Sequence, residues 1–141
     1  MDLISETLHY LGRNKKDIFV VQIGAMDGIT FDDTREFLDI YKWKALLIEP
    51  IPEIFEKLKE NFKNVDNYIY EQSAIVENDG PVEMLTIPYD IIEKENLHHG
   101  YKGMSSVYPL KNGFGSNFQR DIEVKEKFGV NITVPGITFK T

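Results

Sequence analysis

The 141-residue sequence contains no cysteine, and this absence excludes disulfide bonds, thiolate zinc sites and cysteine nucleophiles. It also lacks any apolar run near the ~18 residues of a membrane span, and its N-terminus lacks the basic and apolar stretches of a signal peptide. Basic residues are fewer than acidic ones, which gives a formal net charge of −7 and a pI near 5.0. An acidic chain is poorly suited to nucleic acid or an anionic membrane. We therefore expect a cytoplasmic protein that has neither of these partners.

The apolar residues that are present, 42% of the chain, suffice for the core of one domain. Continuous apolar runs predict strands over residues 17–23, 43–48 and 68–76, with a further strand outside this group over 82–87. Helical periodicity predicts helices over residues 2–14, from Thr30, Asp32 or Asp33 to about Lys42, and from Pro52 to Phe62. The alternation of strand and helix predicts an α/β fold with a doubly wound, mainly parallel sheet.

The regular pattern ends near Pro88. Residues 88–118 are rich in glycine-punctuated loop sequence, which predicts an insertion or a lid over a bound substrate. A short helix over about 116–128 and a strand over 130–139 are predicted to close the chain. Because no further strand–helix units follow, residues 1–141 are interpreted as a single, incomplete domain, truncated after its first half and with little or no turnover alone.

The rest of the chain is arranged around the stretch Ile18–Gly28, in which a buried strand meets two glycines just before a helix. Such a turn suits a negatively charged ligand group, because the backbone can approach closely and helix N–H groups face the turn. The spacing Gly24-x-x-x-Gly28 places Met26 where a dinucleotide site has the glycine that admits a pyrophosphate. The alternative is that both glycines serve only tight strand–helix packing.

Glu49 ends the second predicted strand, 25 residues after Gly24. A carboxylate at this distance is typical of a group that accepts hydrogen bonds from ribose hydroxyls. S-adenosyl-L-methionine satisfies both constraints, because it has a ribose diol, no phosphate, and a carboxylate for the helix N-terminus. The alternative is that Glu49 is a solvated strand end.

The segments Val21–Gly28 and Trp43–Leu58 resemble the FkbM-type methyltransferases, a branch of the Rossmann-like, S-adenosylmethionine-dependent enzymes. The resemblance extends over about Ile18–Glu77 and includes, in order, the glycine turn, a W-x-x-x-L-x-E-P strand end and an E-x-F-x-x-L helix. Two positions depart from the family pattern: Gln22 stands where many methyltransferases have an acid, and Met26 where the family often has Asn. An amide can still form hydrogen bonds with the ligand.

The resemblance implies a cofactor-binding set drawn from the ends of the three strands. In this set Gln22, Gly24, Ala25 and Gly28 surround the methionine part, with Asp27 beside them, Glu49 holds the ribose, Pro50 and Ile51 flank the adenine, and Ser73 and Ala74 close its other side. The implied reaction is methyl transfer to a hydroxyl group of a sugar or secondary metabolite, so the partner is a small-molecule or glycan acceptor. No catalytic base can be named. No metal site is predicted, since the adjacent His98 and His99 are not placed to share one ion.

Two alternative functions remain open. A nicotinamide or flavin oxidoreductase could use the same sheet, although the missing middle glycine disfavours it. A non-catalytic binding or scaffold domain could retain the fold without the chemistry.

Overall fold

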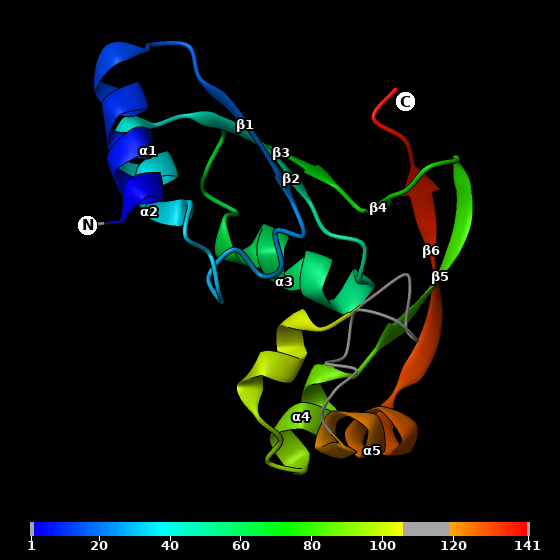
Figure 1. Cartoon of the computed structure of the whole chain (residues 1–141). Helices are drawn as coiled ribbons and strands as arrows, with labels where there is room; N and C mark the ends of the chain where they lie inside the picture. The colour runs from blue at the N-terminus through cyan, green and yellow to red at the C-terminus, as the bar shows by residue number, and fades with distance from the viewer. Residues whose placement is uncertain (1, 106–118, 141) are drawn as a thin grey trace. The chain divides into compact units, whose positions relative to one another are not determined.

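The computed structural model describes residues 2–105 and 119–140 (Figure 1). The chain divides into two compact units, residues 1–75 and residues 76–141. Over the described residues it is a mixed α/β structure with five α-helices and a parallel three-stranded sheet, which is compatible with a Rossmann-like fold. None of the helices in these two ranges is long and apolar enough to cross a membrane.

The first unit contains the parallel sheet. Its elements are α1 (Leu3–Asn14), β1 (Phe19–Ile23), α2 (Arg35–Tyr41), β2 (Lys44–Ile48), α3 (Pro52–Asn61), β3 (Tyr68–Glu71) and β4 (Ala74–Ile75). Strands β1, β2 and β3 lie in that order, with Ile23 level with Ile48 and Ile48 level with Glu71. The predicted parallel arrangement is confirmed for these three strands, and their carboxyl ends form one edge of the sheet.

Local side-chain chemistry sets where the helices begin. Asp2 caps α1, because its Oδ1 accepts a hydrogen bond from the Ser5 N–H at 2.9 Å. Pro52 occupies the first turn of α3, where its missing N–H costs nothing. The N-cap of α2 is Thr34, which is none of the three candidates; Asp32 supports the helix start from two residues earlier, since its Oδ1 accepts from the Arg35 N–H at 3.0 Å.

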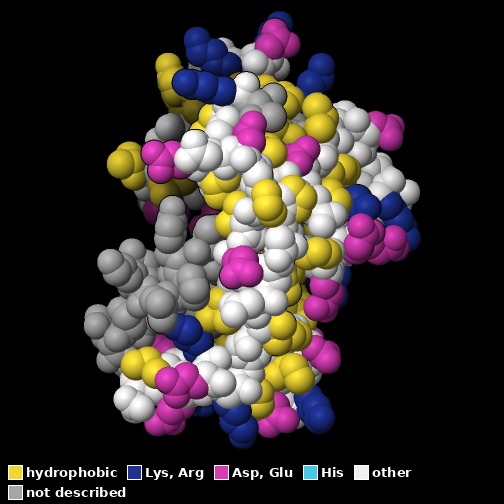
Figure 2. All heavy atoms as spheres, turned by 90° about the vertical axis from the view of Figure 1, so that its right-hand side faces the viewer, with side chains coloured by type: hydrophobic (Ala, Val, Ile, Leu, Met, Phe, Trp, Pro, Cys, Tyr) yellow, Lys and Arg dark blue, Asp and Glu magenta, His cyan; other side chains and the backbone are white. Residues whose placement is uncertain are grey.

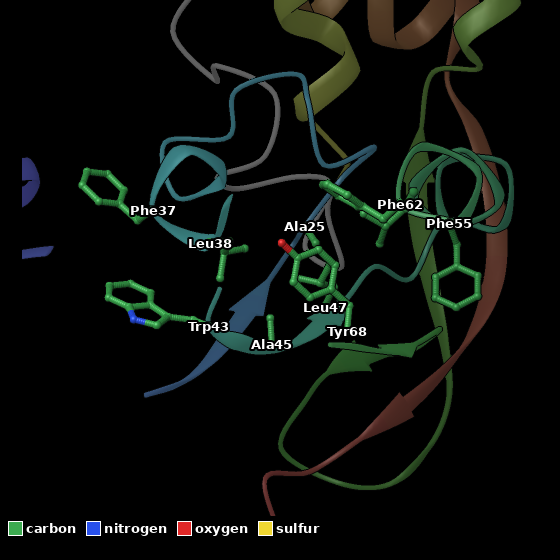
Figure 3. Packing of buried hydrophobic residues seen from close by; sticks show 10 residues of the cluster. Ala25, Phe37, Leu38, Trp43, Ala45, Leu47, Phe55, Phe62 and Tyr68 are labelled. Carbon is green, nitrogen blue, oxygen red and sulfur yellow. The ribbon is translucent and has the colours of Figure 1, made fainter. Parts of the chain in front are cut away.

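The core of the first unit lies on one face of the sheet (Figure 3). Side chains from the two covering helices meet side chains that point inward from the strands. The buried cluster consists of Ala25, Phe37, Leu38, Trp43, Ala45, Leu47, Phe55, Leu58, Phe62 and Tyr68. This packing fixes α2 and α3 above the sheet and so determines the course of the loops at its carboxyl edge.

The third predicted strand is not continuous. The strand predicted over 68–76 breaks at Gln72 and Ser73 into β3 and β4. The Ser73 hydroxyl donates to the Glu71 carboxylate two residues earlier. A local side-chain bond of this kind competes with the strand ladder, and the apolar pattern of the sequence does not reveal it.

Over its described residues, the second unit contains an antiparallel strand pair and three helical segments. Its described elements are β5 (Gly80–Thr86), α4 (Tyr89–Lys94), a short 3-10 helix η1 (His99–Gly103), α5 (Gln119–Phe128) and β6 (Val130–Ile137). Strands β5 and β6 pair from Gly80 with Gly136 to Thr86 with Val130. The strand predicted over 82–87 therefore does lie outside the parallel sheet.

The prediction that residues 88–118 lack regular structure is wrong for their first part. Helix α4 and η1 form there because Tyr89, Ile92 and Tyr101 are buried. Pro88 directly precedes α4. A proline just before apolar residues at helical spacing indicates the start of a helix, and the glycine-rich composition of residues 88–118 obscured this signal. Residues 106–118 lie outside the described residues, and the role of the segment as a lid stays a prediction.

Charged side chains are mixed over the surface that Figure 2 draws. On this face the Lys and Arg side chains lie in several separate groups, with Asp and Glu side chains and hydrophobic side chains between them. This face therefore offers no continuous basic surface.

Candidate functional site

The turn after β1 has an unusual backbone. Gly24, Met26 and Gly28 all have positive φ angles, of 72°, 51° and 71°. The N–H groups of Gly24 and Ala25 both donate to the Ile48 carbonyl oxygen at 2.9 Å. The turn is thus joined to the end of β2. Two of its left-handed positions are occupied by glycine, the residue that adopts this conformation without strain.

The two glycines have different surroundings. A Cβ atom on Gly28 would overlap the Phe62 ring and come within 2.9 Å of Leu58 Cδ1. Among the residues that the structure describes, no atom would lie within 4 Å of a Cβ atom on Gly24. The packing interpretation therefore holds for Gly28, whereas Gly24 lies at an open point of the turn that a ligand could approach.

Glu49 is a buried carboxylate that joins two loops. Its side chain is only 4% exposed; Oε2 accepts from the Met26 N–H at 3.0 Å and Oε1 accepts from the Ile51 N–H at 2.9 Å. Burial raises the pKa of Glu49, the two N–H groups act in the opposite direction, and the charge of Asp27 adds to the increase. Glu49 is therefore not a solvated strand end. Each carboxylate oxygen accepts one of these two bonds and retains a lone pair for another donor.

The Asp27 carboxylate is used within the turn itself. It accepts from the Ile29 N–H at 3.0 Å, and from the N–H and hydroxyl of Thr30 at 2.7 and 2.8 Å. Burial raises the pKa of Asp27, but the hydrogen bonds from Thr30 and Ile29 outweigh burial and lower it. This side chain keeps the turn closed, and a direct role in binding stays a prediction.

Gln22 contacts the start of α2. Its Nε2 donates to Asp32 Oδ1 at 3.2 Å, and its Oε1 accepts from the Thr34 hydroxyl at 3.2 Å. Asp32 Oδ1 also accepts from the N–H groups of Thr34 and Arg35. Asp32 therefore already accepts from the first N–H group of this helix, that of Arg35, and the binding of a ligand carboxylate at the helix N-terminus stays a prediction.

The other candidate residues present little side-chain surface. Two of them follow β2, and two follow β3, the second of these being the first residue of β4. The buried or half-buried candidates are Ala25, Pro50, Ile51, Ser73 and Ala74. They shape the edge, and their contact with a cofactor stays a prediction.

Two residues that support the turn were missed by the sequence reasoning. Asn61 Nδ2 donates to the Asp27 carbonyl oxygen at 2.8 Å. Arg35 lies over the Phe62 ring, 5.1 Å from its centroid, and its Nη1 donates to the Gly28 carbonyl oxygen at 3.4 Å. Neither residue carries a sequence signal, since both reach the turn only after the helices have packed.

Comparisons with protein-family models, with curated proteins and with solved structures give no match for this chain. The functional assignment therefore depends on the geometry of the sheet edge and on the residue pattern that forms it.

Proposed function

We propose that this chain binds S-adenosyl-L-methionine at the carboxyl edge of its parallel sheet. It would be the cofactor-binding part of a methyltransferase that acts on a hydroxyl group of a sugar or secondary metabolite, within a Rossmann-like, doubly wound domain. The main support is the open, left-handed Gly24 in a turn that Glu49 holds against the next strand end.

The residues at this edge fit a nucleoside better than a dinucleotide. Within the described ranges no side chain lies against the backbone at Gly24, and the remaining lone pairs of Glu49 can accept from a ribose diol. At the position where a pyrophosphate needs glycine, the chain has Met26, whose backbone N–H already binds Glu49.

In this function the chain's own residues bind and orient. Bound S-adenosyl-L-methionine supplies an electrophilic methyl group for in-line attack by an acceptor oxygen. The turn after β1 would fix the methionine part, and Glu49 would fix the ribose. The choice of a hydroxyl acceptor derives from the family resemblance alone.

A ligand-dependent stability measurement tests the proposal. S-adenosylhomocysteine should raise the melting temperature of the full chain, since a ligand at 100 times its Kd stabilises the folded state by about 2.7 kcal/mol. Stabilisation by NAD instead would support an oxidoreductase. Stabilisation by neither ligand would support a scaffold domain. The hydrogen bonds that Gln22 and Asp32 already make to other groups of the protein also favour that alternative.

A variant of Glu49 ties the stabilisation to the site. Glu49→Gln keeps the size of the side chain but replaces one acceptor oxygen with an NH₂ group, so we expect the melting shift with S-adenosylhomocysteine to disappear. Glu53→Gln is the matched control, because Glu53 is an exposed residue of α3 that pairs with Lys57. If Glu49→Gln folds and responds to the ligand as the parent chain does, the ribose assignment is wrong.

A further inference from the structure

An open pocket lies at the amino edge of the parallel sheet, opposite the edge that carries the proposed cofactor site. Two segments form it: residues 16–19, which lead into β1, and residues 42–44, which lead into β2. Its volume is about 240 Å³, and it is lined by three lysines, by Asp17 and by the apolar residues Ile18, Phe19 and Trp43. Because β1 and β2 are parallel neighbours, the two segments reach this edge side by side.

The lysines of this pocket are Lys16, Lys42 and Lys44, and all three are exposed. None of them forms an ion pair with a residue of the described ranges, whereas four other lysines each lie within 3.3 Å of a glutamate carboxylate. Three lysines and Asp17 give the lining a formal charge of +2, in a chain whose net charge is −7. A concave site lined mainly by one sign of charge concentrates ligands of the opposite sign.

The dipole of α2 accounts for Lys42 but not for Lys44. Lys42 is the C-cap of this helix, with φ 53°, and a cation there is favourable. Lys44 belongs to β2, where no helix end calls for a cation. The Lys42 carbonyl oxygen accepts from Asn67 Nδ2 at 3.3 Å, and the Asn67 carbonyl oxygen accepts from the Ala45 N–H at 3.2 Å. These bonds hold the backbone that carries both lysines.

We propose that this pocket binds the phosphate group of a small phosphomonoester. A phosphomonoester such as phosphoserine carries a charge of about −1.5 to −2 at pH 7 and three acceptor oxygens. The ligand therefore matches both the formal charge of the pocket and its three ammonium donors. This site is separate from the proposed cofactor site and does not depend on the proposed function.

The size and the walls of the pocket indicate the organic part of the ligand. Its volume is below the range of about 300 to 1,000 Å³ of pockets that enclose drug-sized ligands, so the ester is a small one. Phe19 is 51% exposed, and its position level with Lys44 directs both side chains to the same face of the sheet. The Phe19 ring thus provides an apolar surface beside the cationic group.

Phenyl phosphate, which combines a phosphate with an aromatic ring, is the probe. Titrated into the isotope-labelled full chain, it should shift the backbone amide NMR signals of residues 16–19 and 42–45 and leave those of residues 24–28 unchanged. Lys42→Gln and Lys44→Gln should each weaken its binding about three- to fivefold, the range for an exposed charge pair. Lys15→Gln is the matched control, because Lys15 is the C-cap of α1 and lies outside the lining. This variant should bind as the parent chain does.

Two comparisons separate the parts of the ligand. Phenyl sulfate has the same ring with a single negative charge, so it should bind several-fold more weakly than phenyl phosphate. Phe19→Ala should weaken the binding of phenyl phosphate and leave that of inorganic phosphate unchanged, with far-UV circular dichroism confirming that each variant is folded. An unchanged affinity of Phe19→Ala for phenyl phosphate would contradict the role of its ring.

Three results overturn the proposal as a whole. They are an absence of shifts in the two segments at millimolar phenyl phosphate, unchanged affinity in both Lys42→Gln and Lys44→Gln, and equal binding of phenyl sulfate. Binding of S-adenosylhomocysteine is measured at the opposite edge of the sheet and is not expected to compete with phenyl phosphate. The two proposals therefore fail separately.

Discussion

Gly24 and Gly28 share a left-handed conformation but should respond differently to substitution. Gly24→Ala should cost about 1 to 2 kcal/mol of unfolding free energy, because a Cβ at φ 72° is strained although it meets no atom of residues 2–105 and 119–140. Gly28→Ala should cost a further 1 to 3 kcal/mol or so, because the Cβ also overlaps the Phe62 ring. Urea unfolding of the two variants measures both values.

The same pair separates folding from binding. Gly24→Ala should retain the fold and lose the melting shift with S-adenosylhomocysteine, since the added methyl group occupies the open point of the turn. Equal losses of stability in the two variants would contradict the packing of Gly28 against α3. A full ligand response in Gly24→Ala would remove Gly24 from the site.

Sequence reasoning predicted the turn and the strand end of the proposed site better than the state of their side chains. The glycine turn and Glu49 were found because strand ends, glycines and an acid follow a fixed order along the chain. That order does not specify the partner of each polar group. Glu49 proves to be buried between two N–H groups, and Gln22 binds Asp32. Such pairings depend on packed loops and leave no trace in the spacing.

Because α1 contacts α2, we predict that Gly12→Ala lowers the unfolding free energy, whereas helix propensity alone predicts an increase. By helix propensity alone, Gly12→Ala should gain about 1 kcal/mol of unfolding free energy. In the structure, a Cβ on Gly12 would come within 2.5 Å of Tyr41 Cζ. The Tyr41 ring cannot easily move away, because it stacks on Trp43 and its hydroxyl is 2.9 Å from His9 Nδ1. We therefore expect a net loss, since overpacking costs about 1 to 3 kcal/mol.

A double-mutant cycle provides the control for this prediction. In a Tyr41→Ala background the obstacle is gone, so Gly12→Ala should become stabilising, and chemical denaturation of the four proteins gives the coupling. If Gly12→Ala stabilises the parent chain as well, the described packing of α1 on α2 is incorrect.

Helices and strands with strong apolar periodicity were predictable, and those defined by local polar bonds were not. Helices α1 and α3 and strands β1 and β2 follow from their residue patterns, with ends within a few residues of the prediction. At the break between β3 and β4 the Ser73 hydroxyl donates to Glu71, a bond that the apolar pattern does not reveal. Helix α4 is short, and its few buried residues stand in a glycine-rich context that favours a loop by composition.

Across the whole chain, the proposed site lies within the first of the two compact units. The amides of Gly24, Ala25, Met26 and Ile51 already donate to Ile48 or Glu49, so they exchange hydrogen only when the turn opens. A ligand that binds the closed turn should slow their exchange. We expect S-adenosylhomocysteine to protect residues 24–28 and 49–51 of the full chain, with NAD as the control ligand and the β5–β6 ladder as the internal reference. Added protection over residues 98–105 would support the predicted lid. Protection confined to residues 76–141 would move the site out of the parallel sheet and contradict the assignment of Gly24 and Glu49.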